Sequence, residues 1–426
     1  MSFESFVKAG AASWITSKAR LNLQRMGTEI ARRVRRQGHE LTYFHRVDDP
    51  YSQLMVQVLP ELKERFDVTI RPRVVERLPA AMYPDPARFE AYSILDSARL
   101  ARLYGLGFPH TALVPDRLAI GMASRFLAAN EAHPDFFGLA EEVGAAVWRQ
   151  DVTAIRKLCA GADMGEQRLE ENQKLLRWLG HYASGTIHYG GEFYPGLDRL
   201  DHLERRLNAL GLGDGETHFE LTRLWQYALS NLDRSITGRT VEFFFSVRSP
   251  YSYLAMEQAA KLVEAAGVSL RLRPVLPMVM RGLPVPAAKR RYIVFDAARE
   301  ARLLGIPFGA IVDPVGAAAE RALGIGMSLP NDGSDMAFFR SFMTAVWAEG
   351  VDGNSEKGMA YILEAAGLPA RLARIEVDAG WRAKAERNRQ DMLHAGSWGV
   401  PTFRVGGTTL WGQDRLWAVV EALRHD

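Results

Sequence analysis

The chain repeats itself at an interval of 200 residues, and this repeat limits its fold more than any other feature. The motif Pro-Tyr-Ser-x-Leu begins at Pro50 and again at Pro250. Self-similarity at a long, fixed interval is the signature of repeated structural units. We therefore predict two similar domains. Further matches at this interval pair residues 67–75 with 267–275 and residues 96–108 with 296–308.

The interval grows toward the carboxyl end of each copy. Residues 185–200 match residues 401–416, an interval of 216 residues. The second copy therefore holds about 16 additional residues, which we expect around residues 350–368. We expect a first domain over residues 1–212, a helical linker over 213–239 and a second domain over 240–426.

Each copy predicts the same order of elements. An apolar β-rich run, "LTYFHRV" or "VEFFFSV", is followed by a proline that suits the first turn of a helix. A second strand completes a β-α-β unit, and a long segment with helical spacing follows. Two short strands around a Gly-Gly turn and a last helix close the copy. This pattern predicts an α/β fold of two tandem thioredoxin-like domains, each with an all-helical insertion.

Composition excludes several classes of function. At 426 residues the chain is long enough for two hydrophobic cores. Its single cysteine, Cys159, excludes an internal disulfide framework, a CxxC pair and a multi-cysteine zinc site, and is typical of the reducing cytoplasm. The net charge of +3 gives no case for nucleic-acid binding, and the ten histidines form no metal-binding pattern. We expect no metal and no nucleic-acid partner.

The first 38 residues are more basic than the rest, with eight lysines and arginines against two glutamates. No apolar stretch approaches the roughly 20 residues that span a bilayer. We expect a solvated helix packed on its own domain. A weak contact with an anionic membrane surface is the alternative interpretation, because the segment also carries large apolar side chains, namely Phe3, Phe6, Trp14 and Ile15.

Two motifs in the second copy resemble a known family. "SPYSYLA" (residues 249–255) and "GVPTFRVGG" followed by "LWGQDRL" (residues 399–416) stand about 150 residues apart. In this order they resemble the thioredoxin-like branch that contains DsbA-like oxidoreductases, kappa-class glutathione transferases and 2-hydroxychromene-2-carboxylate isomerases. The resemblance covers nearly all of residues 240–426 and, more weakly, residues 40–212.

The resemblance implies a glutathione site that begins at Ser249. Ser249 and Ser252 stand where dithiol oxidoreductases have their two cysteines, so disulfide exchange is excluded there. By this resemblance Ser249 donates a hydrogen bond to the glutathione thiolate and lowers its pKa, helped by the N-terminus of its helix. For Ser252 we expect a local backbone hydrogen bond in place of direct catalysis.

The second motif implies the remaining contacts with glutathione. Pro401 matches the cis-proline of the family, and the backbone of Val400 would pair with the cysteinyl part of glutathione like an added strand. Gln413 and Asp414 match the polar pair before the last helix, where Asp414 would hold the α-amino group of the γ-glutamyl end. A plain helix N-cap is the alternative role of Asp414.

The first copy departs from these motifs. Asp49 replaces Ser249 and Gly185 replaces Pro401, and a carboxylate beside a thiolate would raise the pKa of the thiol. We expect no glutathione activation there, and we interpret His45 and Asp49 as part of a solvated turn in preference to an acid–base pair. The second copy departs once, because Ser246 stands where the isomerases often have an aspartate.

We expect the charged side chains in the helical segment of the second copy to have structural roles. For Arg299 and Arg302, and for their counterparts Arg99 and Arg102 in the first copy, we expect structural ion pairs with the nearby Asp296 and Asp96, with binding of a substrate anion as the second choice. The run "KRR" at residues 289–291 is interpreted as a solvated helix start.

Two functions from different classes follow. The first is a glutathione-dependent isomerase or transferase that acts on a small aromatic or enone electrophile. The second is a non-catalytic thioredoxin-like binding or scaffold protein, which both cysteine-free sites would allow. In either case we expect the two domains to form an internal pseudo-dimer, with a helix over residues 217–240 between them.

Overall fold

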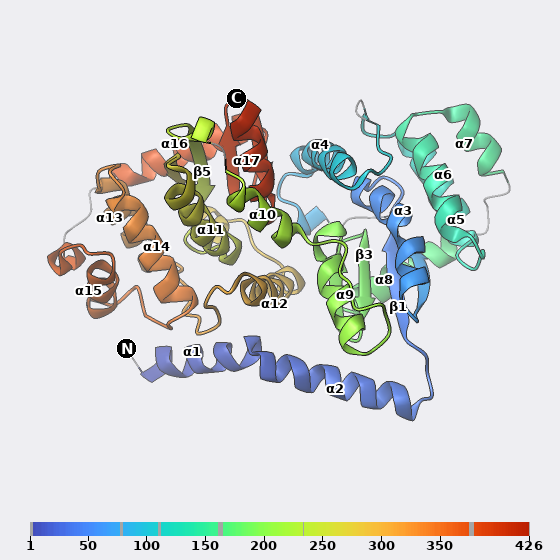
Figure 1. Cartoon of the computed structure of the whole chain (residues 1–426), viewed down its shortest axis with the longest axis horizontal. Coiled ribbons are helices and arrows are strands. Elements are labelled where there is room, and N and C mark those ends of the chain that lie inside the picture. Colours follow the sequence, from blue (N-terminus) through green and yellow to red (C-terminus); the bar gives the residue numbers. More distant parts are fainter. Residues whose placement is uncertain are drawn as a thin grey trace. The chain divides into compact units, whose positions relative to one another are not determined.

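The computed structural model describes residues 3–76, 80–109, 112–160, 165–232, 234–374 and 379–425. The chain divides into two compact units (Figure 1). The N-terminal unit is Leu23–Glu220, and the C-terminal unit is Leu221–Asp426 together with Met1–Asn22. This division differs from the expected boundaries, because the first 22 residues group with the second repeat.

The N-terminal unit is built on a four-stranded sheet with the order β2-β1-β3-β4. Strands β1 and β2 are parallel and are joined by α3, whereas β3 is antiparallel to both β1 and β4. Helices α4 to α8 form the insertion between β2 and β3, and α9 follows β4. The elements are β1 (Glu40–His45), α3 (Pro50–Arg65), β2 (Thr69–Val74), α4 (Pro86–Tyr104), α5 (Arg117–Ala129), α6 (Phe136–Trp148), α7 (Val152–Leu158), α8 (Glu166–Trp178), β3 (Thr186–Tyr189), β4 (Glu192–Pro195) and α9 (Leu200–Ala209).

The C-terminal unit has the same topology, with the strand order β6-β5-β7-β8. The registers also correspond, because Phe244 lies opposite Thr402 as Phe44 lies opposite Thr186. The predicted fold class is thereby confirmed. The elements are α10 (Leu221–Ser230), β5 (Thr240–Phe245), α11 (Pro250–Ala266), β6 (Ser269–Pro274), α12 (Ala287–Leu304), α13 (Ala317–Ser328), α14 (Ser334–Trp347), α15 (Glu356–Ala365), α16 (Gly380–His394), β7 (Thr402–Val405), β8 (Thr408–Trp411) and α17 (Leu416–His425).

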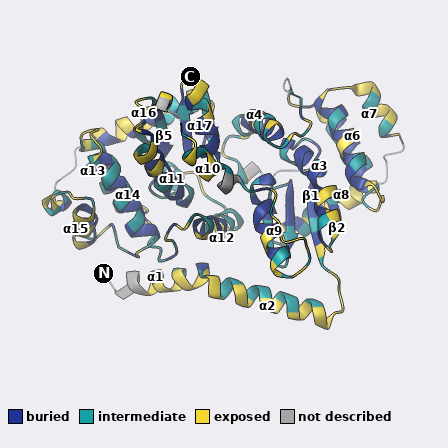
Figure 2. Cartoon of the chain, in the orientation of Figure 1, coloured by how far each residue is buried: buried dark blue, intermediate teal, exposed yellow. Residues whose placement is uncertain are grey.

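The central strand β5 ends in three consecutive phenylalanines that belong to the hydrophobic core. Phe243, Phe244 and Phe245 are all fully buried, and the ring of Phe243 stacks on that of Phe403 at 4.7 Å between centroids. Figure 2 shows the same burial for β1 and β5. Burial of such side chains contributes roughly 1.5–3 kcal/mol each. The sheet is therefore a rigid base for the loop that follows β5.

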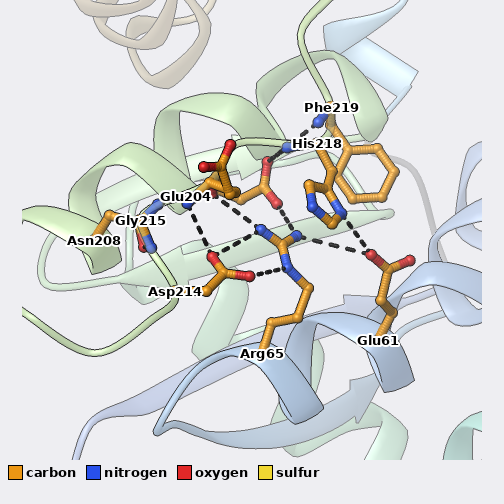
Figure 3. A network of polar contacts seen from close by, with 9 residues as sticks. Glu61, Arg65, Glu204, Asn208, Asp214, Gly215, His218 and Phe219 are labelled. Atoms are coloured by element: carbon orange, nitrogen blue, oxygen red, sulfur yellow. Dashed lines mark hydrogen bonds and ion pairs between the residues drawn. The ribbon is translucent and has the colours of Figure 1, made fainter.

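The segment after α9 is fixed to the N-terminal unit by a polar network. Figure 3 shows Arg65 between the carboxylates of Glu204 and Asp214. Glu204 is fully buried and also accepts the backbone N–H groups of His218 (2.9 Å) and Phe219 (3.2 Å). The helix predicted over residues 217–240 is therefore shorter than expected. Only Leu221–Ser230 is α-helical, and residue 233 lies outside the described residues.

Two helices precede the first sheet, α1 (Phe3–Thr16) and α2 (Lys18–Val34). Helix α1 contacts α12, where Arg302 donates to the carbonyl oxygen of Thr16 at 2.9 Å. The side chains of Phe3 and Phe6 lie outside the described residues. Of the helices in the described ranges, none has the length and apolar content needed to cross a membrane.

Candidate functional site

Ser249 caps the N-terminus of α11 and is half-buried. Its Oγ accepts the backbone N–H of Ser252 at 3.1 Å, from an extended backbone conformation. This bond uses a lone pair of the oxygen, so the hydroxyl proton is still available. The described part of the chain offers that proton no acceptor. Ser249 can therefore cap the helix and donate a hydrogen bond to a ligand at the same time.

Two further serines lie close to Ser249 in sequence, Ser246 in the loop after β5 and Ser252 in the first turn of α11, and they differ in their partners. Ser252 is fully buried, and its Oγ accepts the N–H of Ser246 at 3.3 Å, which agrees with the predicted structural role. The Oγ of Ser246 is also buried, with the residue 4% exposed, but it has no hydrogen-bond partner among the described residues. A buried hydroxyl without a partner is unfavourable by about 1–3 kcal/mol. Ser246 is thus a buried polar group whose hydrogen-bonding capacity is not met within the described structure.

Val400 and Pro401 reach the same edge of the sheet as this loop. The Val400–Pro401 peptide bond is cis. Strands β5 and β7 are antiparallel and their register ends with Phe244 opposite Thr402, so Ser246, which follows β5, and Val400, which precedes β7, lie at the same end of the sheet. The carbonyl oxygen of Pro401 accepts the N–H of Gly412 at 3.0 Å. In contrast, neither the N–H nor the C=O of Val400 has a partner within the described residues.

Gln413 lies deeper than the sequence suggested. It is 3% exposed, its Nε2 donates to Glu300 at 2.9 Å, and its Oε1 accepts from Gln258 at 3.0 Å. Both polar atoms of its side chain are therefore occupied inside the protein. The contacts join the 3₁₀ turn at Gln413–Arg415 to α11 and α12. Asp414 is half-buried and lies 3.3 Å from the guanidinium of Arg415.

A charged side chain of α12 binds the first turn of α11 through a hydrogen bond. The hydroxyl of Tyr251 donates to Asp296 at 2.6 Å, and Asp296 also pairs with Arg299. The ion pair that we predicted for Arg299 is confirmed. Lys289 differs from the solvated side chain that we expected, because it is half-buried and its burial lowers its pKa to about 8.

The N-terminal unit closes the equivalent site with its own side chains. Asp49 caps α3 and is 5% exposed. Its carboxylate accepts from the N–H of Tyr51 (3.2 Å) and from the hydroxyls of Ser52 and Ser184 (both 2.8 Å). Gly185 stands at the position of Pro401 with φ +59°, and a Cβ there would lie 3.0 Å from Asp49 Oδ2. The negative charge of this carboxylate would disfavour a thiolate beside it.

Arg46 occupies the position of Ser246 in that unit. Its guanidinium is buried and lies 2.7 Å from Asp48, whose pKa is raised by burial. His45 is also buried, and desolvation lowers its pKa to about 3. Its Nδ1 lies 3.2 Å from the hydroxyl of Tyr43. The solvated turn expected for His45 and Asp49 is wrong, because both side chains are buried, but they also form no acid–base pair.

Comparisons with known proteins agree with this topology. Residues 240–424 match the family model of the DSBA-like thioredoxin domain. The chain is 28% identical over 201 residues to 2-hydroxychromene-2-carboxylate isomerase of Pseudomonas putida, an alignment that covers 43% of this chain and 93% of that protein. The enzyme of the same name from another Pseudomonas strain is 27% identical over 196 residues, covering 43% and 89%.

Solved structures are similar as well. A structure of 2-hydroxychromene-2-carboxylate isomerase is 25% identical, with a TM-score of 0.37, and the match covers 44% of this chain and 95% of that one. The cytosolic disulfide reductase DsbM from Pseudomonas aeruginosa with GSH is 22% identical, with a TM-score of 0.34, and the match covers 44% and 100%. Residues 240–424 are thus a DSBA-like thioredoxin domain in a chain that is homologous to 2-hydroxychromene-2-carboxylate isomerase over 43% of its length.

Proposed function

We propose that the C-terminal unit is a glutathione-dependent isomerase or transferase for a small aromatic or enone electrophile. Homology to 2-hydroxychromene-2-carboxylate isomerase supports the class of reaction. The observation that carries the proposal is a set of polar groups at the end of β5 that have no protein partner in the described structure. They are the O–H of Ser249, the Oγ of Ser246 and the backbone N–H and C=O of Val400.

Ser249 and the N-terminus of α11 provide the electrostatic part of the site. When bound, glutathione supplies a thiolate nucleophile that can add to an electrophilic double bond. The hydroxyl of Ser249 donates to the sulfur, and the N-terminal end of the 17-residue α11 favours negative charge there. Hydrogen bonds to a charged form stabilise that form, so both groups lower the pKa of the thiol.

Val400 and Asp414 provide the binding part of the site. The open N–H and C=O of Val400 are suited to pair with a peptide-like backbone in the manner of an added strand. Asp414 receives the α-amino group of the γ-glutamyl end. Gln413, which we first expected to bind ligand as well, has both polar atoms bonded to Gln258 and Glu300, so it positions Asp414 instead. A reaction that uses free glutathione fits the cytoplasm, where thiols stay reduced.

We also propose that the two units arose by tandem duplication and that only the second kept a thiol site. Both sheets have the same strand order, and their strand registers correspond. The N-terminal unit fills its site with Arg46, Asp49 and Ser184, which favours a non-catalytic role for that unit. Packing of the two units as an internal pseudo-dimer is part of this proposal.

Titration calorimetry with glutathione tests the proposal on the full chain. Wild-type protein should bind, and Ser249→Ala should bind more weakly because the sulfur loses its donor. The substitution also removes an N-cap, which costs about 1 kcal/mol of stability. The variant is therefore tested well below its unfolding temperature, with Ser355→Ala as a matched N-cap loss far from the site, since Ser355 caps α15. Wild-type protein that binds no glutathione would overturn the proposal.

A further inference from the structure

Helix α2 turns its apolar side away from the protein. Leu23, Met26, Ile30 and Val34 follow a helical spacing of three and four residues, so they form one stripe along the helix. Their exposed fractions are 52%, 55%, 55% and 77%. In Figure 2 the exposed colour runs along α2. We call these four residues the α2 stripe.

The opposite side of α2 is polar, and this is the side that binds the N-terminal unit. Arg25 forms two hydrogen bonds with the carboxylate of Glu192, at 2.8 and 2.9 Å. Glu29 accepts from the hydroxyl of Tyr189 at 3.2 Å. A surface helix of a globular protein usually buries its apolar side and exposes its polar side. The reversed orientation of α2 indicates a partner for the stripe outside this unit.

The charges near the stripe indicate the chemistry of that partner. Arg33, Arg35 and Arg36 are exposed at the carboxyl end of the helix. The only acidic residue between positions 18 and 38 is Glu29, which lies on the bound side and pairs with Arg32. A second copy of the chain would bring arginines against arginines or against Lys18. The charge therefore favours an anionic partner with an apolar interior.

We propose that the α2 stripe binds the surface of an anionic lipid bilayer, with the helix in the plane of the interface. The four apolar side chains enter the boundary of the acyl chains, and the exposed arginines contact acidic headgroups. This geometry is that of an interfacial amphipathic helix. Each basic residue near an anionic surface contributes attraction that salt weakens.

Co-sedimentation of the full chain with vesicles tests this inference. Vesicles of phosphatidylcholine mixed with phosphatidylglycerol should bind the wild-type protein, and vesicles of phosphatidylcholine alone should bind it much less. The double variant Leu23→Ser/Ile30→Ser should lose about tenfold or more in binding, since burial of two such side chains contributes more than the 1.4 kcal/mol of a tenfold change. Leu118→Ser, on α5 at 80% exposure, is the matched control and should bind like wild type.

Three outcomes would overturn the inference. Wild-type protein that does not bind the acidic vesicles, or a stripe variant that binds them as well as the Leu118→Ser control, excludes a lipid partner. Light scattering that shows a wild-type dimer and a monomeric stripe variant assigns the stripe to a second copy of the chain. Circular dichroism of both variants verifies that they are folded.

Discussion

The hydroxyl of Ser184 donates a 2.8 Å hydrogen bond to Oδ2 of Asp49, and this contact distinguishes the two units. Ser184 precedes Gly185 as Val400 precedes Pro401, and Asp49 caps α3 as Ser249 caps α11. Val400 has no side-chain donor, and Ser249 has no carboxylate. The capping side chain Asp49 therefore has its hydrogen bonds satisfied within its own unit, whereas the hydroxyl proton of the capping side chain Ser249 is open to a ligand.

Gly185→Ala should destabilise the N-terminal unit by about 1–3 kcal/mol for two reasons. Alanine is strained in the left-handed backbone conformation of Gly185, and its Cβ would lie close to Oδ2 of Asp49. Gly180→Ala is the matched control. Gly180 also has a positive φ, of +85°, but a Cβ there meets nothing within 4 Å. Urea unfolding of both variants measures the difference. Equal losses would show that Gly185 is not packed against Asp49.

His45→Phe should reduce the loss of stability at acid pH. The folded pKa of His45 is about 3, below its ordinary value of 6.5, so the unfolded chain takes up the proton first. The stability that the neutral, buried His45 contributes is fully present above pH 6.5 and is lost as the pH falls toward 3. At pH 5 the loss amounts to about 2 kcal/mol.

Phenylalanine fits this position, because Phe245 occupies it in the C-terminal unit. Urea unfolding at neutral pH and at pH 5 compares the variant with wild type. Part of the acid sensitivity should persist, since His188 has its pKa lowered to about 4 by burial. An unchanged difference between the two pH values would contradict the account of His45.

Cys159 should be inert in the folded protein. It is 3% exposed, and burial raises the pKa of its thiol to about 11, so the reactive thiolate is scarce at neutral pH. Titration with a chromogenic disulfide should release one thiol per chain in denaturant and react far more slowly without it. Native reactivity equal to that of free glutathione would mean that Cys159 is accessible.

Gln413 and Asp414 should respond differently to substitution. Gln413→Ala removes two buried hydrogen bonds, one with Glu300 and one with Gln258, which should cost about 1–3 kcal/mol of stability. Asp414→Asn keeps a polar oxygen beside the buried Arg415 and should weaken glutathione binding with a smaller loss of stability than Gln413→Ala. Thermal unfolding and calorimetry on each variant separate the two roles. Stability that Gln413→Ala leaves intact would show that the buried network is not structural.

The internal repeat made the sheet predictable, because apolar strands and a proline after the first strand occur in both copies. The N-cap serine, the local bond of Ser252 and the pair of Asp296 with Arg299 also follow from short-range patterns. Each of these interactions joins residues that are close in sequence.

The roles that could not be predicted depend on contacts between residues far apart in the sequence. Gln413 looked like a ligand donor at a helix start, yet its partners Gln258 and Glu300 come from helices 155 and 113 residues away. The basic N-terminal segment predicted a solvated helix packed on its own domain but not which side of α2 faces the protein, since that depends on Glu192 and Tyr189. Ser246 appeared only as a departure from a family pattern until its burial was known.

The pKa of the thiol of bound glutathione tests the central claim most directly. Ultraviolet absorbance of the thiolate, followed as pH rises, gives this pKa. With wild-type protein the midpoint should lie about one pH unit or more below that of free thiol, whose ordinary pKa is about 8.5. Ser249→Thr keeps the hydroxyl and should keep the low midpoint. Ser249→Asp keeps the cap but adds the carboxylate found at Asp49, so the midpoint should return to the free value or rise above it. A wild-type midpoint equal to that of free glutathione, or a low midpoint that survives in Ser249→Asp, would contradict the account.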